Sequence, residues 1–162
     1  MKKYFIVAVF FMAAFAFQVS AADMPEGLPP ADGEAFWTYI TKAKPYGGWG
    51  YWPGYYGMYP GKSPHGAYLK FYANGIALRA AREGKPMPYG AILVKENYGK
   101  DKETLMAITP MYKIEGYSPQ TGDWFWAKYG PKGKIQAAGQ IKSCIDCHSA
   151  KKAEDYIFTK PE

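Results

Sequence analysis

The alternation of hydrophobic and polar positions predicts a series of β-strands in the middle of the chain. Four segments are rich in β-branched and aromatic residues and end in turn-forming residues. They are residues 67–72, 91–98, 105–117 and 124–129. Pro110 has no N–H to give to a β-ladder, so the third segment is expected to be an edge strand or a broken one. Residues 118–123 are expected to form a tight connection before the last strand.

Two other segments have the features of short helices. Residues 32–44 are predicted to form one helix, with Asp32 as its N-cap. Residues 74–83 are predicted to form another, capped by Asn74 and ended by Gly84. With 18 Gly and 13 Pro, the chain lacks the long periodic stretches of a helical bundle. The expected fold is therefore α+β, a mainly antiparallel β-sheet with a few short helices.

The N-terminus has the order of an export signal. Two lysines precede an apolar run over residues 4–17, and small residues follow at its exit. The run is shorter than the roughly 20 residues of a membrane span, although an uncleaved anchor is the alternative. We therefore predict a signal peptide over residues 1–22, a periplasmic location, and one domain over residues 23–162.

The charge and the cysteine content limit the partners and the cofactor chemistry that the chain can have. The formal net charge of +6 comes from basic residues scattered along the chain, which argues against a nucleic-acid partner. Export to an oxidising compartment normally favours a disulfide. The chain has only two cysteines, however, and they are separated by two residues and followed directly by a histidine. This spacing indicates a different role.

The segment Cys144-Ile145-Asp146-Cys147-His148 carries the attachment signature of c-type haem, close to the C-terminus. Two intervening residues let both sulfurs reach the vinyl groups along one edge of the porphyrin, and the next imidazole can ligate the iron. Cys144 and Cys147 are therefore predicted to tether one covalently attached haem c, with His148 as the proximal ligand. A redox dithiol would need a βαβ context, and a zinc site would need more ligands than this segment supplies.

Any sixth protein ligand must come from upstream of the motif, because residues 149–162 contain neither Met nor His. The candidates are His65, Met58, Met87, Met106 and Met111. Methionines are more often core residues than ligands, and a histidine between a proline and a glycine is more often part of a turn. An open or weakly occupied distal position is therefore expected.

Residues 46–59 have an unusual density of Tyr, Trp and Gly. One interpretation is a Gly-rich surface loop, and the other is an aromatic wall against the haem or a partner subunit. Burial is favoured, because rings this dense seldom stay solvated.

Taken together, these motifs resemble the cytochrome P-460 family, which includes the cytochromes c′-beta. The resemblance covers nearly all of the chain after the predicted signal peptide. It rests on "SPHG" at 63–66, "MPYGAILVKENY" at 87–98, "KIEGYSPQTGDWFWAKY" at 113–129, "CIDCH" at 144–148 and "DYIF" at 155–158. It implies a mainly antiparallel β fold, usually dimeric, with one c-type haem, a proximal histidine and no protein ligand on the distal face.

The resemblance implies two kinds of activity. Members of the P-460 type oxidise hydroxylamine with nitric oxide as co-reactant, and a lysine is cross-linked to their porphyrin. Members of the c′-beta type lack the cross-link and bind nitric oxide or carbon monoxide under an apolar cap. Lys95 in "ILVKE" matches the position of the cross-linking lysine, and it is therefore a candidate haem-binding residue.

Lys95 shares one face of its predicted strand with Ala91 and Leu93, so it projects from a largely apolar surface. A buried amine beside a porphyrin would have a lowered pKa, which makes it nucleophilic. The alternative is an ordinary lysine that pairs with a carboxylate or caps the sheet edge.

Hydroxylamine oxidation would also need a distal carboxylate as proton acceptor, which the resemblance places between the lysine and the haem motif. Residues 132–142 contain no Asp or Glu, and Gln136 or Gln140 could only hydrogen-bond a ligand. Carboxylates further upstream are more often solvated surface residues. They are Glu96, Asp101, Glu103, Glu115 and Asp123. This pattern counts against the oxidase.

The expected function is a periplasmic monohaem c-type cytochrome, homodimeric, whose open distal site binds small diatomic gases, chiefly nitric oxide. An apolar pocket gives dioxygen little stabilisation, whereas nitric oxide and carbon monoxide bind without a hydrogen-bond donor. The first alternative is an oxidase of hydroxylamine and nitric oxide with a Lys95–haem cross-link. The second is an electron-transfer cytochrome with His65 or a methionine as sixth ligand. The sequence specifies no redox partner.

Overall fold

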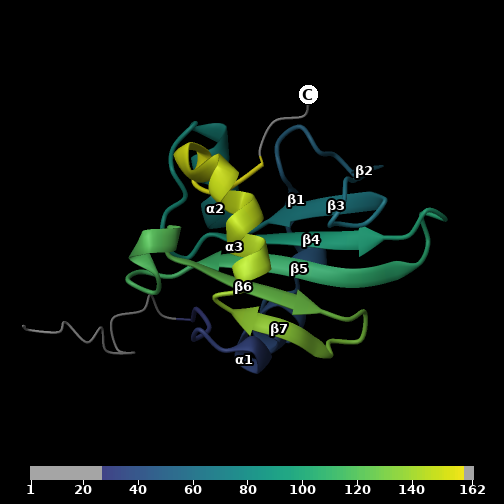
Figure 1. Ribbon diagram of the computed structural model, residues 1–162, viewed down its shortest axis with the longest axis horizontal. Coiled ribbons are helices and arrows are strands. Elements are labelled where there is room, and N and C mark those ends of the chain that lie inside the picture. The colour runs from purple at the N-terminus through teal and green to yellow at the C-terminus, as the bar shows by residue number, and fades with distance from the viewer. Residues whose placement is uncertain (1–26, 159–162) are drawn as a thin grey trace, which may run out of the picture.

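A computed structural model describes residues 27–158 of the chain. The predicted signal peptide, residues 1–22, lies outside the described residues. The described chain forms an antiparallel sheet in the order β1-β3-β4-β5-β6-β7, in which β2 also pairs with β3 (Figure 1). The strands are β1 (Gly50–Tyr51), β2 (Met58–Pro60), β3 (Tyr68–Ala73), β4 (Ile92–Tyr98), β5 (Leu105–Lys113), β6 (Trp124–Tyr129) and β7 (Ile135–Gly139). The expected α+β fold is confirmed.

Short helices connect and cover the strands. They are α1 (Gly33–Thr38), extended by a π-helical turn over Tyr39–Ala43, α2 (Gly75–Arg82), and α3 (Lys142–His148), followed by a 3-10 segment over Ser149–Glu154. Single 3-10 turns occupy Tyr46–Gly48 and Pro119–Thr121. Among the helices of residues 27–158, none is long and apolar enough to cross a bilayer.

Both predicted helix caps are confirmed. The Asp32 Oδ1 atom accepts hydrogen bonds from the backbone N–H groups of Glu34 and Ala35, at 3.0 and 2.8 Å. The Asn74 Oδ1 atom accepts one from Ala77, at 3.0 Å. These bonds satisfy backbone donors that the first helical turn leaves without a partner.

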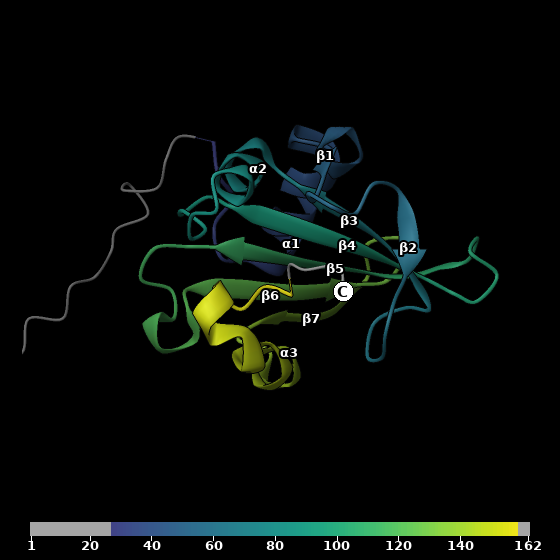
Figure 2. The same ribbon diagram turned by 90° about the horizontal axis from the view of Figure 1, so that it is seen from above.

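The sheet separates two hydrophobic cores. Leu93 of β4 faces the core that lies beneath α2 and α3, whereas Ile92 and Val94 face the core formed with Phe36 of α1. Figures 1 and 2 show α3 and α1 on opposite faces of the sheet. The alternation along β4 is the period of two expected for a strand that is buried on both faces.

Pro110 does not lie at a sheet edge, so that part of the prediction is wrong. It is fully buried in β5, which pairs with β4 on one side and β6 on the other. The ladder between β5 and β6 has no residue pair between Ile108 and Met111. A central strand accommodates the proline because the ladder is interrupted there.

The aromatic run over residues 46–59 is largely packed rather than solvated, as predicted. Trp52 is buried and stacks on Phe71 at 5.2 Å between ring centroids, and Tyr51 stacks on Tyr72 at 4.9 Å. Tyr56 is the exception, at 81% exposed. The run includes β1 and β2, and both of these strands pair with β3. None of its residues lines the cavity described below.

Candidate haem site

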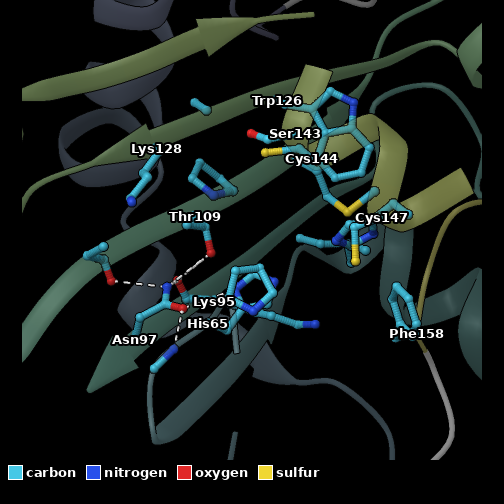
Figure 3. Close-up of a pocket in the computed structure, with 18 of the residues that line it drawn as sticks. His65, Lys95, Asn97, Thr109, Trp126, Lys128, Ser143, Cys144, Cys147 and Phe158 are labelled. Atoms are coloured by element: carbon cyan, nitrogen blue, oxygen red, sulfur yellow. Dashed lines mark hydrogen bonds between the residues drawn. The ribbon is translucent and has the colours of Figure 1, made fainter. Parts of the chain in front are cut away.

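A cavity of about 450 Å³ lies between one face of the sheet and α3. Its walls come from β3 to β7, from α3, from the loop before β3 and from the segment after α3. The walls are mainly apolar, and the cationic side chains of Lys95 and Lys128 also line them (Figure 3). A cavity of this size with a few polar groups is typical of a cofactor or small-molecule site.

Helix α3 brings the three residues of the haem motif to this cavity. Cys144, Cys147 and His148 all line it. Residues separated by three and four positions lie on the same side of a helix, so this spacing turns both thiols and the imidazole toward one space. Both cysteines are free thiols, and burial raises the pKa of Cys144.

His148 is held in one orientation. Its Nδ1 atom lies 2.6 Å from the backbone oxygen of Tyr156. Because a carbonyl oxygen can only accept, Nδ1 carries the proton and Nε2 keeps its lone pair. Burial lowers the pKa of His148, which favours the neutral ring that ligates metals. Trp126 and Phe158 pack edge-on to the ring, at centroid separations of 4.7 and 5.2 Å.

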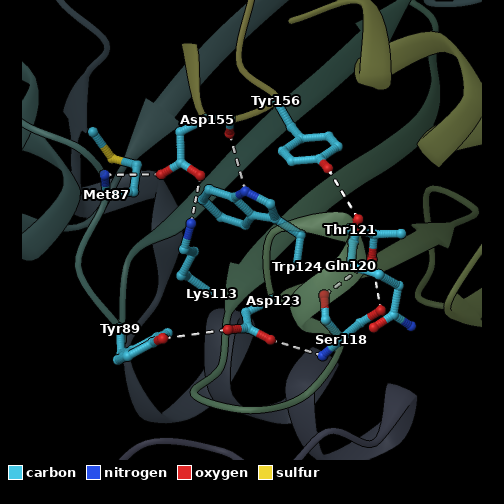
Figure 4. Close-up of polar contacts among 10 residues, drawn as sticks. All are labelled: Met87, Tyr89, Lys113, Ser118, Gln120, Thr121, Asp123, Trp124, Asp155 and Tyr156. Atoms are coloured by element: carbon cyan, nitrogen blue, oxygen red, sulfur yellow. Dashed lines mark hydrogen bonds and ion pairs between the residues drawn. The ribbon is translucent and has the colours of Figure 1, made fainter. Parts of the chain in front are cut away.

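The backbone that accepts from His148 is itself fixed by polar contacts (Figure 4). Asp155 and Tyr156 both adopt left-handed conformations, with φ of +55° and +63°. The Asp155 carboxylate accepts the backbone N–H of Met87 at 2.9 Å and forms an ion pair with Lys113. The Asp155 carbonyl accepts the indole N–H of Trp124 at 3.0 Å. These contacts hold two unfavourable backbone conformations and thereby aim the Tyr156 carbonyl at His148.

His65 lies at the same cavity, on the loop between β2 and β3 (Figure 3). Its Nδ1 atom lies 3.0 Å from Asn97 Oδ1. The Asn97 Nδ2 atom, which carries two hydrogens, lies within hydrogen-bond distance of three acceptors: the carbonyls of Lys95 and Ala107, and the Thr109 hydroxyl, at 3.0 to 3.2 Å. Asn97 Oδ1 is therefore the acceptor, so His65 also carries its proton on Nδ1. Burial, with Lys95 nearby, lowers the pKa of His65 to about 4.

Lys95 extends from β4 into the cavity, as the alternation predicted. Its Nζ atom lies over the Phe71 ring, 4.6 Å from the centroid. Among the described residues it forms no ion pair with a carboxylate. Burial lowers its pKa to about 8, which leaves a larger share of neutral amine than an exposed lysine has.

No Asp or Glu within residues 27–158 lines the cavity. Glu96, the neighbour of Lys95, points to the other face and accepts hydrogen bonds from Tyr46, Tyr72 and Tyr98. Asp123 accepts the backbone N–H of Ser118 and the Tyr89 hydroxyl, away from the cavity. The carboxylates named from the sequence as proton acceptors are thus absent from these walls.

The other sequence candidates divide between the cavity and the rest of the molecule. Met106, Met111 and Gln136 line the cavity, whereas Met58, Met87 and Gln140 do not. Sequence reasoning missed Asn97 and Asp155, the two residues whose contacts orient the histidines. Both lie within the motifs quoted above, "KENY" and "DYIF". For Asn97 the available signal was an Asn inside a predicted strand.

The donor set suits a covalently held porphyrin better than a bare metal ion. Two thiols and a neutral imidazole with a free Nε2 lie on one wall of a mainly apolar cavity. Across the described residues, His, Cys, Asp and Glu do not gather in groups of three able to hold a metal ion. A flat apolar ring, anchored at its edge and ligated through one imidazole, would satisfy these groups.

The comparison with known families agrees with a haem site. The family model for cytochrome P460 matches residues 46–159, which include the sheet, the cavity walls and the Cys-x-x-Cys-His segment. No curated protein matches the chain.

Proposed function

Because the chain belongs to the cytochrome P460 family and is therefore a haem cytochrome, we propose that its cavity holds one haem c and binds small diatomic gases such as nitric oxide. Cys144 and Cys147 tether the porphyrin, and His148 ligates the iron on the proximal side. When bound, the haem would supply an iron able to bind nitric oxide and carbon monoxide.

The observation that carries the proposal is the state of His148 beside the two thiols. Its Nδ1 donates to a backbone carbonyl at 2.6 Å, as the second nitrogen of a metal-ligating histidine usually does. His148 is 8% exposed and lines the same cavity as both cysteines. A structural core histidine would have no reason to share its cavity with two free thiols.

The walls favour gas binding over hydroxylamine oxidation. Removing protons from hydroxylamine requires a base near the substrate, and no carboxylate within the described part of the chain reaches the cavity. Apolar groups such as Leu93, Ala107 and Phe158 line it instead. Nitric oxide and carbon monoxide are small, weakly polar ligands that such walls admit.

Lys95 supports the oxidase as a second candidate function. A cavity-lining amine with a pKa of about 8 has a larger neutral, nucleophilic fraction than an exposed lysine, which favours a lysine–haem cross-link. Mass spectrometry of proteolytic peptides decides between the two. The gas-binding proposal predicts a Lys95 peptide without haem mass, and the oxidase predicts a haem-linked one.

The test of the proposed function is an optical titration of the reduced, purified protein with nitric oxide under anaerobic conditions. We expect a saturable shift of the haem bands, and haem that stays bound to the polypeptide after denaturation. In a C144S/C147S variant the haem should be extractable with organic solvent. An unchanged spectrum, as an electron-transfer cytochrome with a permanent sixth ligand would give, contradicts the proposal.

Two further parts of the proposal concern the whole protein. We propose that residues 1–22 are removed on export to the periplasm and that the mature chain forms a homodimer. N-terminal sequencing of protein isolated from the periplasm tests the first part. Light scattering of the holoprotein as it elutes from a size-exclusion column tests the proposed homodimer, and a monomeric mass contradicts it.

A further inference from the structure

His65 and His148, the two histidines of the chain, line one cavity from different walls. Their ring centroids are 6.3 Å apart and their ring planes are inclined at 82°. We propose that His65 is a second axial ligand of the haem iron in the resting protein, and that a diatomic gas must displace it to bind. The inference rests on the proposed function, because it concerns the same haem and the same gas.

The separation fits two imidazoles that share one metal ion. A metal–imidazole bond is about 2 Å long and the nitrogen lies roughly 1 Å from the ring centre, so opposed rings have centroids about 6 Å apart. Rings that pack directly on His148 are closer: Trp126 at 4.7 Å and Phe158 at 5.2 Å. His65 is therefore farther from His148 than either of these two rings is.

The surroundings of His65 repeat those of His148. In each ring Nδ1 donates to a protein oxygen, Asn97 Oδ1 for His65 and the Tyr156 carbonyl for His148. Within residues 27–158, neither Nε2 atom has a hydrogen-bond partner. A free Nε2 with a fixed tautomer is the arrangement of metal-ligating histidines.

Other cavity residues are less suited to ligate the iron. Lys95 Nζ lies over Phe71, and an amine must be neutral to ligate. Met111 is 7% exposed and packed in the core beneath α3, whereas Met106 is 46% exposed. Among these groups only His65 combines a neutral ring, a fixed tautomer and a defined separation from His148.

His65 is also the ligand that can leave. His148 is flanked by the two proposed tethers, Cys144 and Cys147, so it stays beside any haem they hold. His65 lies on a loop, and within residues 27–158 a single hydrogen bond, to Asn97, holds its side chain. If the unligated state has a population of about one tenth, the apparent gas affinity falls about tenfold. The distal face then opens only when His65 moves away.

The test compares wild type with His65→Ala, both carrying covalent haem and reduced anaerobically, with carbon monoxide as the probe. Wild type is expected to be low-spin, and the variant to be high-spin with unchanged haem content. Added imidazole should return the variant to the low-spin form. The variant should bind carbon monoxide about tenfold more tightly, or more.

A high-spin wild-type spectrum overturns the inference without any variant, whether or not the variant folds. It is also overturned if His65→Ala stays low-spin, or if Met111→Leu or Met106→Leu becomes high-spin in its place. If neither wild type nor His65→Ala binds carbon monoxide or nitric oxide, the proposed function is wrong. The spin-state comparison still decides the role of His65 in that case, so the two failures are distinguishable.

Discussion

His148 and His65 have the same local chemistry but different anchors. His148 donates to a backbone carbonyl, at the end of a helix that also carries both cysteines. His65 donates to a side-chain amide, from a loop. The first anchor belongs to a turn fixed by an ion pair and several hydrogen bonds, whereas the second depends on one residue, Asn97. Under the two proposals above, His148 is the permanent ligand and His65 the exchangeable one.

The largest effect is expected from His148→Ala. Removing a group that only supports a metal ligand costs roughly 10- to 100-fold in metal affinity, so losing the ligand itself should cost more. We expect the low-spin spectrum to disappear and the yield of haem-loaded protein to fall. His65→Ala is the matched control, and it should keep its haem. A His148→Ala spectrum identical to that of wild type would remove His148 from the proximal role.

The anchor of His148 can be weakened through Asp155→Ala. This change leaves Lys113 and the Met87 N–H without their partner, and we expect a loss of about 2 to 3 kcal/mol in the free energy of unfolding. Asp155→Asn keeps an acceptor for Met87 and should lose about half as much. Urea denaturation of the two variants measures the difference. A shift of the haem bands in Asp155→Ala that Asp155→Asn largely reverses would identify Asp155 as a positioning residue for His148.

Lys95 lies near both histidines, and its lowered pKa makes the stability of the folded protein depend on pH. Its folded pKa of about 8 is below the ordinary value of 10.5, so burial of the charged amine costs stability below pH 8. Lys95→Met should therefore stabilise the protein by about 2 to 3 kcal/mol at pH 7. Between pH 8 and 10.5 the unfolded chain holds the extra proton, so wild type recovers and the gain fades. Denaturation of both proteins at pH 7 and pH 10.5 checks this, and an equal gain at both would contradict it.

The smallest effect is expected from Thr109→Val, which removes one of the three acceptors of the Asn97 amide. The cost in stability should be about 1 kcal/mol or less. Because Asn97 still accepts from His65, only a small high-spin fraction should appear in the optical spectrum. Conversion as complete as in His65→Ala would mean that the anchor of His65 is far weaker than the hydrogen bonds indicate.

The sequence predicted features that depend on local spacing. The alternation in residues 91–98 placed Lys95 on the cavity face and Glu96 on the other, and the two caps followed from Asp32 and Asn74. Strand β7 was not predicted, because Ile135–Gly139 is short and mostly exposed and lacks a buried alternation. Helix α3 was not predicted either, since its N-cap residue, Ile141, provides no side-chain hydrogen bond.

Contacts between distant residues could not be predicted from one sequence. The approach of His65 to His148 depends on how α3 crosses the sheet. The pairing of Asp155 with Lys113 depends on the turn that follows α3 and contains Asp155. Pro110 misled the strand assignment because an interruption between two central strands is a tertiary feature. Motif spacing predicted Cys144, Cys147 and His148 as haem-binding residues, and packing determines which residues orient the histidines.

Carbon monoxide binding to the reduced protein, measured side by side for wild type and His65→Ala, tests the central claim most directly. The account predicts that both proteins bind the gas saturably at a covalently attached haem, and that the variant binds it about tenfold more tightly or more. Equal affinities of the two proteins for carbon monoxide, or failure of both to bind it with haem attached and His148 intact, would contradict it.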